Sequence, residues 1–156
     1  MRDAIVRLKF LGRTDLGDPL GRALGAWARR RRHIDAHAVV VPIASSAARI
    51  RERGYCHATL LARGAAQELA LRLDPFGLVR VHQEGRQLGR TRDERRASLR
   101  GAYASSGKMR GKSVVLVDDV RTTGATMDAA MTALREVGVA RVLPLVVAFT
   151  QDDPMP

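Results

Sequence analysis

Residues 114–126 read VVLVDDVRTTGAT and combine an apolar run, two adjacent acids and a loop of small residues. The apolar run is typical of a parallel strand that is covered on both faces. In open α/β sheets ligands bind at the carboxyl ends of the strands, which is where Asp118 and Asp119 fall. Adjacent carboxylates repel each other, so the pair needs hydrogen-bond donors, a metal ion or water around it. The neighbouring hydroxyls of a sugar ring match that need.

The loop after the acids, TTGAT, offers backbone N–H groups, hydroxyls and a glycine directly before a predicted helix. Because unpaired N–H groups at a helix N-terminus attract anions, we expect this loop to bind a phosphate. Its residues are Thr122, Thr123, Gly124, Ala125 and Thr126. Strand, acids and loop together predict a ribose 5-phosphate site. The alternative interpretation is that the acids are ordinary turn residues and that Thr126 only caps a helix.

The hydrophobic pattern along the chain predicts a mostly parallel α/β sheet flanked by helices, a Rossmann-like three-layer arrangement. Strands are expected within residues 36–44, 78–82, 113–117 and 141–149, and helices over 16–27, 59–73 and 126–137. Pro144 indicates an edge strand or a bulge. We expect one domain over residues 1–150 and a C-terminal tail over residues 151–156.

The 156 residues carry a net charge of +11, and all but three of the 27 basic residues are arginines. Arginine suits phosphate, so the charge favours a phosphorylated metabolite or a nucleic acid as partner, although the organism's own amino-acid usage explains it equally well. No apolar run approaches the roughly 18 residues of a spanning helix, and we expect a soluble cytoplasmic protein without a membrane partner. Cys56 is the single cysteine, which excludes an intrachain disulfide and a thiolate-rich zinc site.

Residues 114–126 closely resemble the phosphoribosyl pyrophosphate (PRPP) signature of type I phosphoribosyltransferases. Three further segments resemble the ComF competence branch of that family: LKF at 8–10, RERGYCHATLLA at 51–62, and the arginine-rich loop with Gln87 that precedes GAY at 101–103. The chain departs from the branch in lacking its four-cysteine module, so zinc is not expected. Cys56 and His57 replace the usual Asn-Gln, and without matching partners they do not indicate nucleophilic or metal chemistry.

The resemblance implies a type I phosphoribosyltransferase fold and the transfer of ribose 5-phosphate from PRPP to a nitrogen acceptor, with release of pyrophosphate. It implies that Asp118 and Asp119 are the catalytic acids that hold the ribose hydroxyls, and that they contact Mg²⁺ through ribose or water. The loop at 122–126 would bind the 5-phosphate. The residues implied in pyrophosphate binding are Ile43, Ala44, Arg49, Arg51 and Arg53 after the first strand, and Arg86, Arg92, Arg95 and Arg96 in the second loop.

The alternative from another class is a non-catalytic module that uses the same fold to bind single-stranded nucleic acid. Only 4% of the residues are aromatic, which leaves few platforms for stacking bases and weakens this alternative. A P-loop kinase is excluded because no glycine-rich loop ends in Gly-Lys-Ser/Thr. The family resemblance suggests a link to DNA uptake in competence, while the acceptor base is not readable and the oligomeric state, including a homodimer, stays open.

Overall fold

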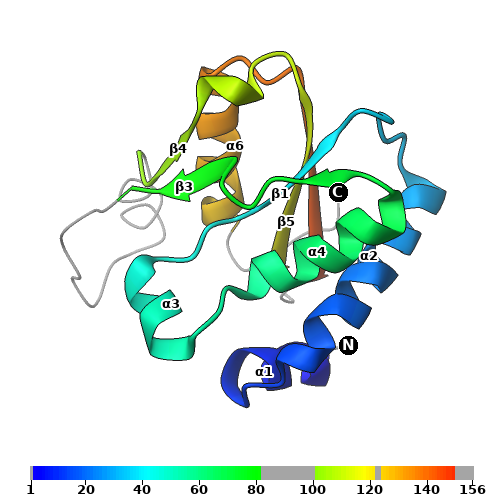
Figure 1. Cartoon of the computed structure of the whole chain (residues 1–156), viewed down its shortest axis with the longest axis vertical. Coiled ribbons are helices and arrows are strands. Elements are labelled where there is room, and N and C mark those ends of the chain that lie inside the picture. The colour runs from blue at the N-terminus through cyan, green and yellow to red at the C-terminus, as the bar shows by residue number, and fades with distance from the viewer. Residues whose placement is uncertain (1, 82–100, 122–123, 150–156) are drawn as a thin grey trace.

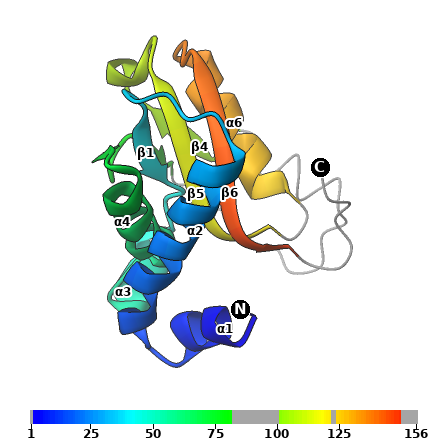
Figure 2. The ribbon, with the colours of Figure 1, turned by 90° about the vertical axis from the view of Figure 1, so that its right-hand side faces the viewer.

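The computed structural model describes residues 2–81, 101–121 and 124–149, whose centre is a parallel sheet with helices on both faces (Figures 1 and 2). The sheet has four strands in the order β2-β1-β5-β6, and all its pairs are parallel. Its strands are β1 (Val39–Pro42), β2 (Arg72–Leu73), β5 (Ser113–Arg121) and β6 (Arg141–Phe149). The predicted α/β class is confirmed, and Pro144 lies on the edge strand β6 as its missing N–H requires.

Helices α2 and α4 cover one face of the sheet and α6 covers the other (Figure 2). The helices are α1 (Arg2–Phe10), α2 (Gly17–Arg31), α3 (Ala47–Arg53), α4 (His57–Leu69) and α6 (Ala125–Glu136), with short 3₁₀ turns η1 (Thr14–Leu16) and η2 (Gly107–Met109). Among the described residues, no helix combines the length and the apolar character needed to cross a membrane.

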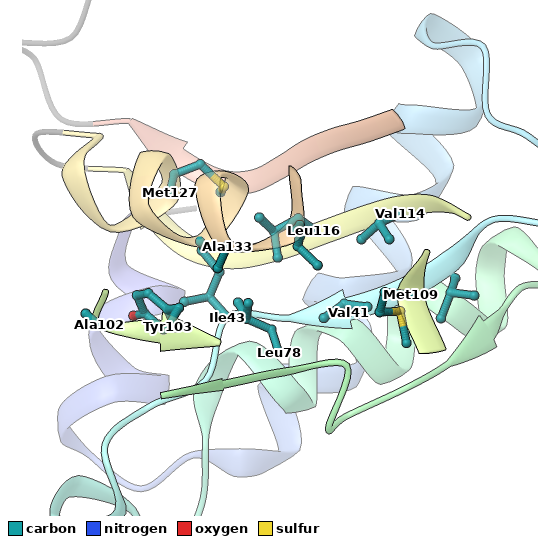
Figure 3. Close-up of a cluster of buried hydrophobic side chains, with 13 residues drawn as sticks. Val41, Ile43, Leu78, Ala102, Tyr103, Met109, Val114, Leu116, Met127 and Ala133 are labelled. Carbon is teal, nitrogen blue, oxygen red and sulfur yellow. The ribbon is translucent and has the colours of Figure 1, made fainter. Parts of the chain in front are cut away.

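Alternate residues of the central strands face opposite layers, as the two-residue period of a strand requires. Val41 and Leu116 pack with α6 in one apolar cluster, which Figure 3 shows together with Met109 and Tyr103. Val40 packs with α2 and α4 in a second cluster on the other face. Both faces of β1 and β5 are therefore buried, which explains why these strands are continuous apolar runs.

Helices α2 and α4 approach each other closely because both carry glycines at their contact. A Cβ atom on Gly21 would lie 2.1 Å from the carbonyl oxygen of Leu61, and one on Gly64 would lie 2.2 Å from that of Asp18. Neither position admits a side chain unless the backbones separate. The contact fixes the position of α4, whose first residue is His57.

The predicted helix over 59–73 is wrong at its C-terminal end. Helix α4 ends at Leu69 because Ala70 adopts a left-handed conformation with φ 55°, and the chain then turns back to pair Leu73 with Val40 of β1. The apolar spacing that placed Leu73 on the helix continues by coincidence into an edge strand.

The strand expected at 78–82 forms, but not in the main sheet. It is β3 (Leu78–Arg80), which pairs antiparallel with β4 (Tyr103–Ser105) in a separate two-stranded sheet. Leu78 is fully buried in the cluster beneath α6, so the pair covers the edge of that cluster. On the side of β1 away from β5, the parallel neighbour is instead β2, which the sequence did not indicate.

Trp27 continues the spacing of Leu20 and Leu24, which predicts that it lies on the core-facing side of its helix, yet 41% of its surface is exposed. The guanidinium groups of Arg31 and Arg32 lie over its ring, at 5.6 Å and 5.7 Å from the ring centroid. The buried residues of α2 are, apart from Leu24, glycines and one alanine, because its close contact with α4 leaves no room for an indole.

Candidate functional site

Strand β5 extends beyond its neighbour β1, and the acid pair lies on the extension. The pairing of β1 with β5 ends at Pro42 and Val117, and one further hydrogen bond runs from the Ile43 N–H to the Val117 oxygen at 2.9 Å. Asp118 pairs only with Val146 of β6. The acids therefore belong to the strand, and the alternative that they are turn residues is wrong. The side of β5 that β1 leaves open is at the carboxyl edge of the sheet, where ligands bind in this class.

Asp119 is enclosed by charged and polar groups although only 7% of its surface is exposed. Its Oδ2 atom lies 2.9 Å from Nζ of Lys9, and its Oδ1 accepts the N–H of Val120 at 2.6 Å. Nδ1 of His57 lies 3.7 Å from the same Oδ2. The contacts to Oδ2 come from α1 and α4, and the contact to Oδ1 comes from the next residue of β5. Two helices distant in sequence and the strand itself therefore hold one carboxylate in a defined orientation.

Asp118 has a different environment. Its Oδ1 accepts the backbone N–H of Asp119 at 2.9 Å. Burial, and then the charge of Asp119, raise the pKa of Asp118 to about 7, while the backbone N–H of Asp119 and the charge of Lys9 act in the opposite direction. At neutral pH Asp118 is thus poised between its two protonation states. Hydroxyl donors that stabilise the carboxylate would favour the charged form.

His57 is buried beside the Asp119 carboxylate. Its ring is 5% exposed, and it meets the Tyr55 ring edge-on at 5.2 Å between centroids. Burial lowers the pKa of His57; the charge of Asp119 raises it, and the charges of Arg53 and Lys9 lower it. Within the described part of the chain, Nε2 of His57 is a buried polar atom without a hydrogen-bond partner. The lowered pKa favours the neutral imidazole. Sequence reasoning did not connect His57 with the acids.

The neighbouring Cys56 faces the loop that follows β1. Its Sγ lies 3.3 Å from Oγ of Ser45 and 3.8 Å from the carbonyl oxygen of Ile43. Cys56 and His57 thus point to different partners, one to the loop and one to the acid. This arrangement agrees with the sequence-based interpretation that the two do not act as a nucleophilic pair.

The described part of the loop that is predicted to bind phosphate, residues 122–126, begins at Gly124, immediately before α6. Gly124 has φ 74°, a conformation that favours glycine, and its carbonyl accepts the N–H of Asp128 at 2.9 Å. Gly124, not Thr126, is the N-cap residue, and it has no side chain with which to cap the first turn. Ala125 is buried and Thr126 half-buried in that turn. Thr122 and Thr123 lie outside the described residues.

The residues expected to bind pyrophosphate after β1 fall in two groups. Ile43 and Ala44 continue β1, and the side chain of Ile43 is buried. Arg49, Arg51 and Arg53 lie on α3, whose N-terminus is capped by Ser46, and the first two are exposed. Burial raises the pKa of the Tyr103 hydroxyl; the charge of Asp118 raises it further and that of Arg49 lowers it. Arg86, Arg92, Arg95 and Arg96 lie outside the described residues.

The site is completed by a residue that sequence reasoning had not assigned to it, Lys9 of α1. The segment LKF was recognised only as part of a family resemblance, and nothing in its spacing related it to a strand more than a hundred residues later. Figure 2 shows α1 at the end of the sheet where the strands have their carboxyl ends. A cation there is what the repulsion between two adjacent carboxylates requires.

Comparison with known families identifies the class of protein. The sequence pattern of the phosphoribosyl transferase domain matches residues 57–155, and the chain belongs to that family. It is 31% identical over 140 residues to competence protein ComFC of Bacillus subtilis, covering 90% of this chain and 55% of that protein. It is 31% identical over 122 residues to competence protein F of Haemophilus influenzae, covering 74% of this chain and 52% of that protein. The predicted ComF-like family is confirmed, and the chain spans about half the length of these relatives.

A solved structure shows the same fold at lower identity. Glutamine PRPP amidotransferase from B. subtilis, complexed with ADP and GMP, superposes with a TM-score of 0.63 at 19% identity, over 97% of this chain and 32% of that one. The shared part is thus one portion of a larger enzyme. The similarity establishes the architecture of a phosphoribosyltransferase-like protein and not its substrate.

Proposed function

We propose that this protein binds PRPP together with Mg²⁺ and transfers its ribose 5-phosphate to a nitrogen acceptor. In this reaction the bond from C1 to the pyrophosphate oxygen breaks, a bond from C1 to the acceptor nitrogen forms, and the acceptor gives up a proton. Asp118 and Asp119 hold the ribose hydroxyls, and the loop at residues 122–126 holds the 5-phosphate. Catalysis then rests on positioning the sugar between two anchored anions.

The observation that supports this proposal most is the acid pair on the part of β5 that extends past β1. Two carboxylates in a partly buried site are costly unless a ligand supplies donors, and vicinal hydroxyls supply two. The start of α6 lies a few residues further along the chain, at the point where a phosphate on the same sugar would be bound.

The donor set fits Mg²⁺ only as an ion shared with the substrate. In the described residues no group of three or more His, Cys, Asp or Glu side chains is placed to hold a metal. Mg²⁺ commonly takes one or two carboxylates and completes its shell with water and phosphate oxygens, so Asp118 and Asp119 would contact it through ribose or water. When bound, Mg²⁺ would neutralise charge on the departing pyrophosphate.

The arginines of α3 would stabilise that pyrophosphate. Arg49 and Arg51 expose their guanidinium groups on the helix that follows the loop after β1, and a guanidinium can donate two parallel hydrogen bonds to phosphate oxygens. We further propose that the protein acts in the cytoplasm and contributes to DNA uptake. The second point is supported by the names of its two curated relatives, both competence proteins.

The test is calorimetric titration of the protein with PRPP in the presence and absence of Mg²⁺. We expect Mg²⁺-dependent binding to the wild type, and loss of that binding in the Asp118→Asn, Asp119→Asn double variant. Asp15→Asn, which changes an exposed aspartate in η1, is the matched control and should bind like the wild type. Absence of binding to the wild type would disprove the proposed substrate.

Turnover is tested separately by measuring pyrophosphate release with a panel of nucleobases and amines. Release with one acceptor would identify the reaction, whereas binding of PRPP without release from any acceptor would favour a non-catalytic module. Single-stranded DNA titrations distinguish that module, because binding through 6 to 10 phosphates loses on the order of 10³ to 10⁵ in affinity between 50 and 200 mM salt.

A further inference from the structure

Two adjacent residues near the C-terminal end of α1 make contacts that hold this helix beside the site. The carbonyl oxygen of Leu8 accepts the hydroxyl of Tyr55 at 2.7 Å, and Nζ of Lys9 lies 2.9 Å from Oδ2 of Asp119. Leu8 itself is fully buried and packs in the cluster formed by α2, α4 and the central strands. The backbone at Lys9 is therefore held in place by its neighbour, at a position from which the side chain reaches Asp119.

The ion pair between Lys9 and Asp119 is not an ordinary surface contact. Their side chains are 25% and 10% exposed, and the carboxylate lies against the buried ring of His57. Among the contacts that the structure describes, Lys9 brings the positive charge to Asp119. The N–H of Val120 orients the other carboxylate oxygen.

We infer that Lys9 is a positioning residue of the sugar site, which holds the Asp119 carboxylate in the orientation that the ribose requires. The inference rests on the proposed binding of PRPP and adds a residue that lies outside the matched family region, residues 57–155. Helix α1 is then part of the binding site. An acid that is already aligned loses less freedom when the sugar binds, which increases affinity.

The positioning role differs from two other roles that an ammonium group could have here. If Lys9 contacted the pyrophosphate itself, its effect would be independent of Asp119. If it blocked the site by occupying the place of the ribose hydroxyls, its removal would increase affinity. The three roles therefore predict different results for the same set of variants.

The experiment measures PRPP affinity in the presence of Mg²⁺ for the full chain and five variants, two of which complete the double-mutant cycle described below. Lys9→Met keeps the aliphatic stem and removes the charge, and we expect a loss of roughly 10- to 100-fold. Lys9→Arg should recover most of that loss, because the guanidinium can still pair with Asp119. Arg7→Met is the control: it removes an exposed cation from the same helix and should leave affinity unchanged.

The double-mutant cycle with Asp119→Asn decides between the roles. If Lys9 acts through Asp119, the double variant should bind no more weakly than Asp119→Asn alone, a strongly non-additive result. Losses that multiply would overturn the inference in favour of direct contact with the ligand. Unchanged or increased affinity in Lys9→Met, or equal loss in Arg7→Met, would also overturn it.

These outcomes are separable from failure of the proposed function. A wild type that does not bind PRPP disproves the substrate and, with it, this role of Lys9. A wild type that binds, with Lys9→Met binding equally well, disproves the role of Lys9 alone. Circular dichroism and thermal melts of each variant identify a general loss of structure, and the Lys9→Arg variant keeps the test decisive if Lys9→Met does not fold.

Discussion

The acid pair on β5 and the arginines of α3 differ in how firmly the fold holds them. Asp119 is 7% exposed and has partners on both carboxylate oxygens, contributed by α1, α4 and β5. Arg49 and Arg51 lie exposed on a seven-residue helix whose described residues are not fully buried. The acid pair, proposed to recognise the sugar, is therefore built into the core, while the arginines proposed to recognise pyrophosphate lie on the surface.

The largest effect is expected for the two acids of β5, which the fold holds in place. Asp118→Asn and Asp119→Asn should each weaken PRPP binding by roughly 10- to 100-fold, since each removes a charge-assisted hydrogen bond to a ribose hydroxyl. The measurement is calorimetry in the presence of Mg²⁺. If either variant bound like the wild type, that acid would not contact the sugar.

The second prediction concerns the close contact between α2 and α4. Gly21→Ala should destabilise the fold by about 1–3 kcal/mol, because the new Cβ would meet the Leu61 carbonyl at 2.1 Å. Chemical denaturation measures the free energy of unfolding, and Gly107→Ala, where nothing lies within 4 Å of the added atom, is the control. A Gly21 variant as stable as the wild type would show that this contact does not hold α4 in place.

The third prediction concerns pH and the protein without ligand or Mg²⁺. Because the pKa of Asp118 is raised from 3.8 to about 7, the folded state holds a proton that the unfolded state has lost over this range. The contribution of Asp118 to stability is therefore present below about pH 4 and is lost as the pH rises towards 7. Since the carboxyl is partly exposed, we expect an effect of about 1–2 kcal/mol.

The lowered pKa of His57 acts in the opposite direction, since stability is lost as pH falls below its ordinary value. The measurement is therefore the difference between the denaturation curves of the wild type and Asp118→Asn across pH 4–7. Relative to the variant, the wild type should lose stability as the pH rises. A difference that does not change with pH would contradict the raised pKa.

The smallest effect is expected for the exposed arginines of α3. Arg51→Ala should weaken PRPP binding by less than about 10-fold, because exposed charges are screened by salt and held loosely. Arg141→Ala is the control, since Arg141 begins β6 beside Ser113 at the other end of β5 from the acids. A loss for Arg51→Ala as large as for Asp118→Asn would mean that ligand binding orders α3, and the distinction between the two sides would fail.

Much of the fold was predictable because its signals are local. The apolar run before Asp118 predicted a covered parallel strand, and Gly138, with φ 81°, follows the end of α6 at Glu136, a position where glycine commonly stops a helix. The errors lie where local pattern and tertiary pairing compete. Leu73 continues a helical spacing, yet it pairs with Val40 because the edge of β1 was open to a further strand.

The pair of acids and the glycine before α6 could be predicted from the sequence alone, because they are neighbours in the chain. The family could also be predicted, because its motifs are short local segments. Only the tertiary structure decided what surrounds the acids. Lys9 and His57 reach Asp119 because α1 and α4 pack beside the exposed end of β5. No sequence spacing encodes a contact between residues 9 and 119, because it depends on the burial of Leu8 and on the close packing of two helices against the sheet.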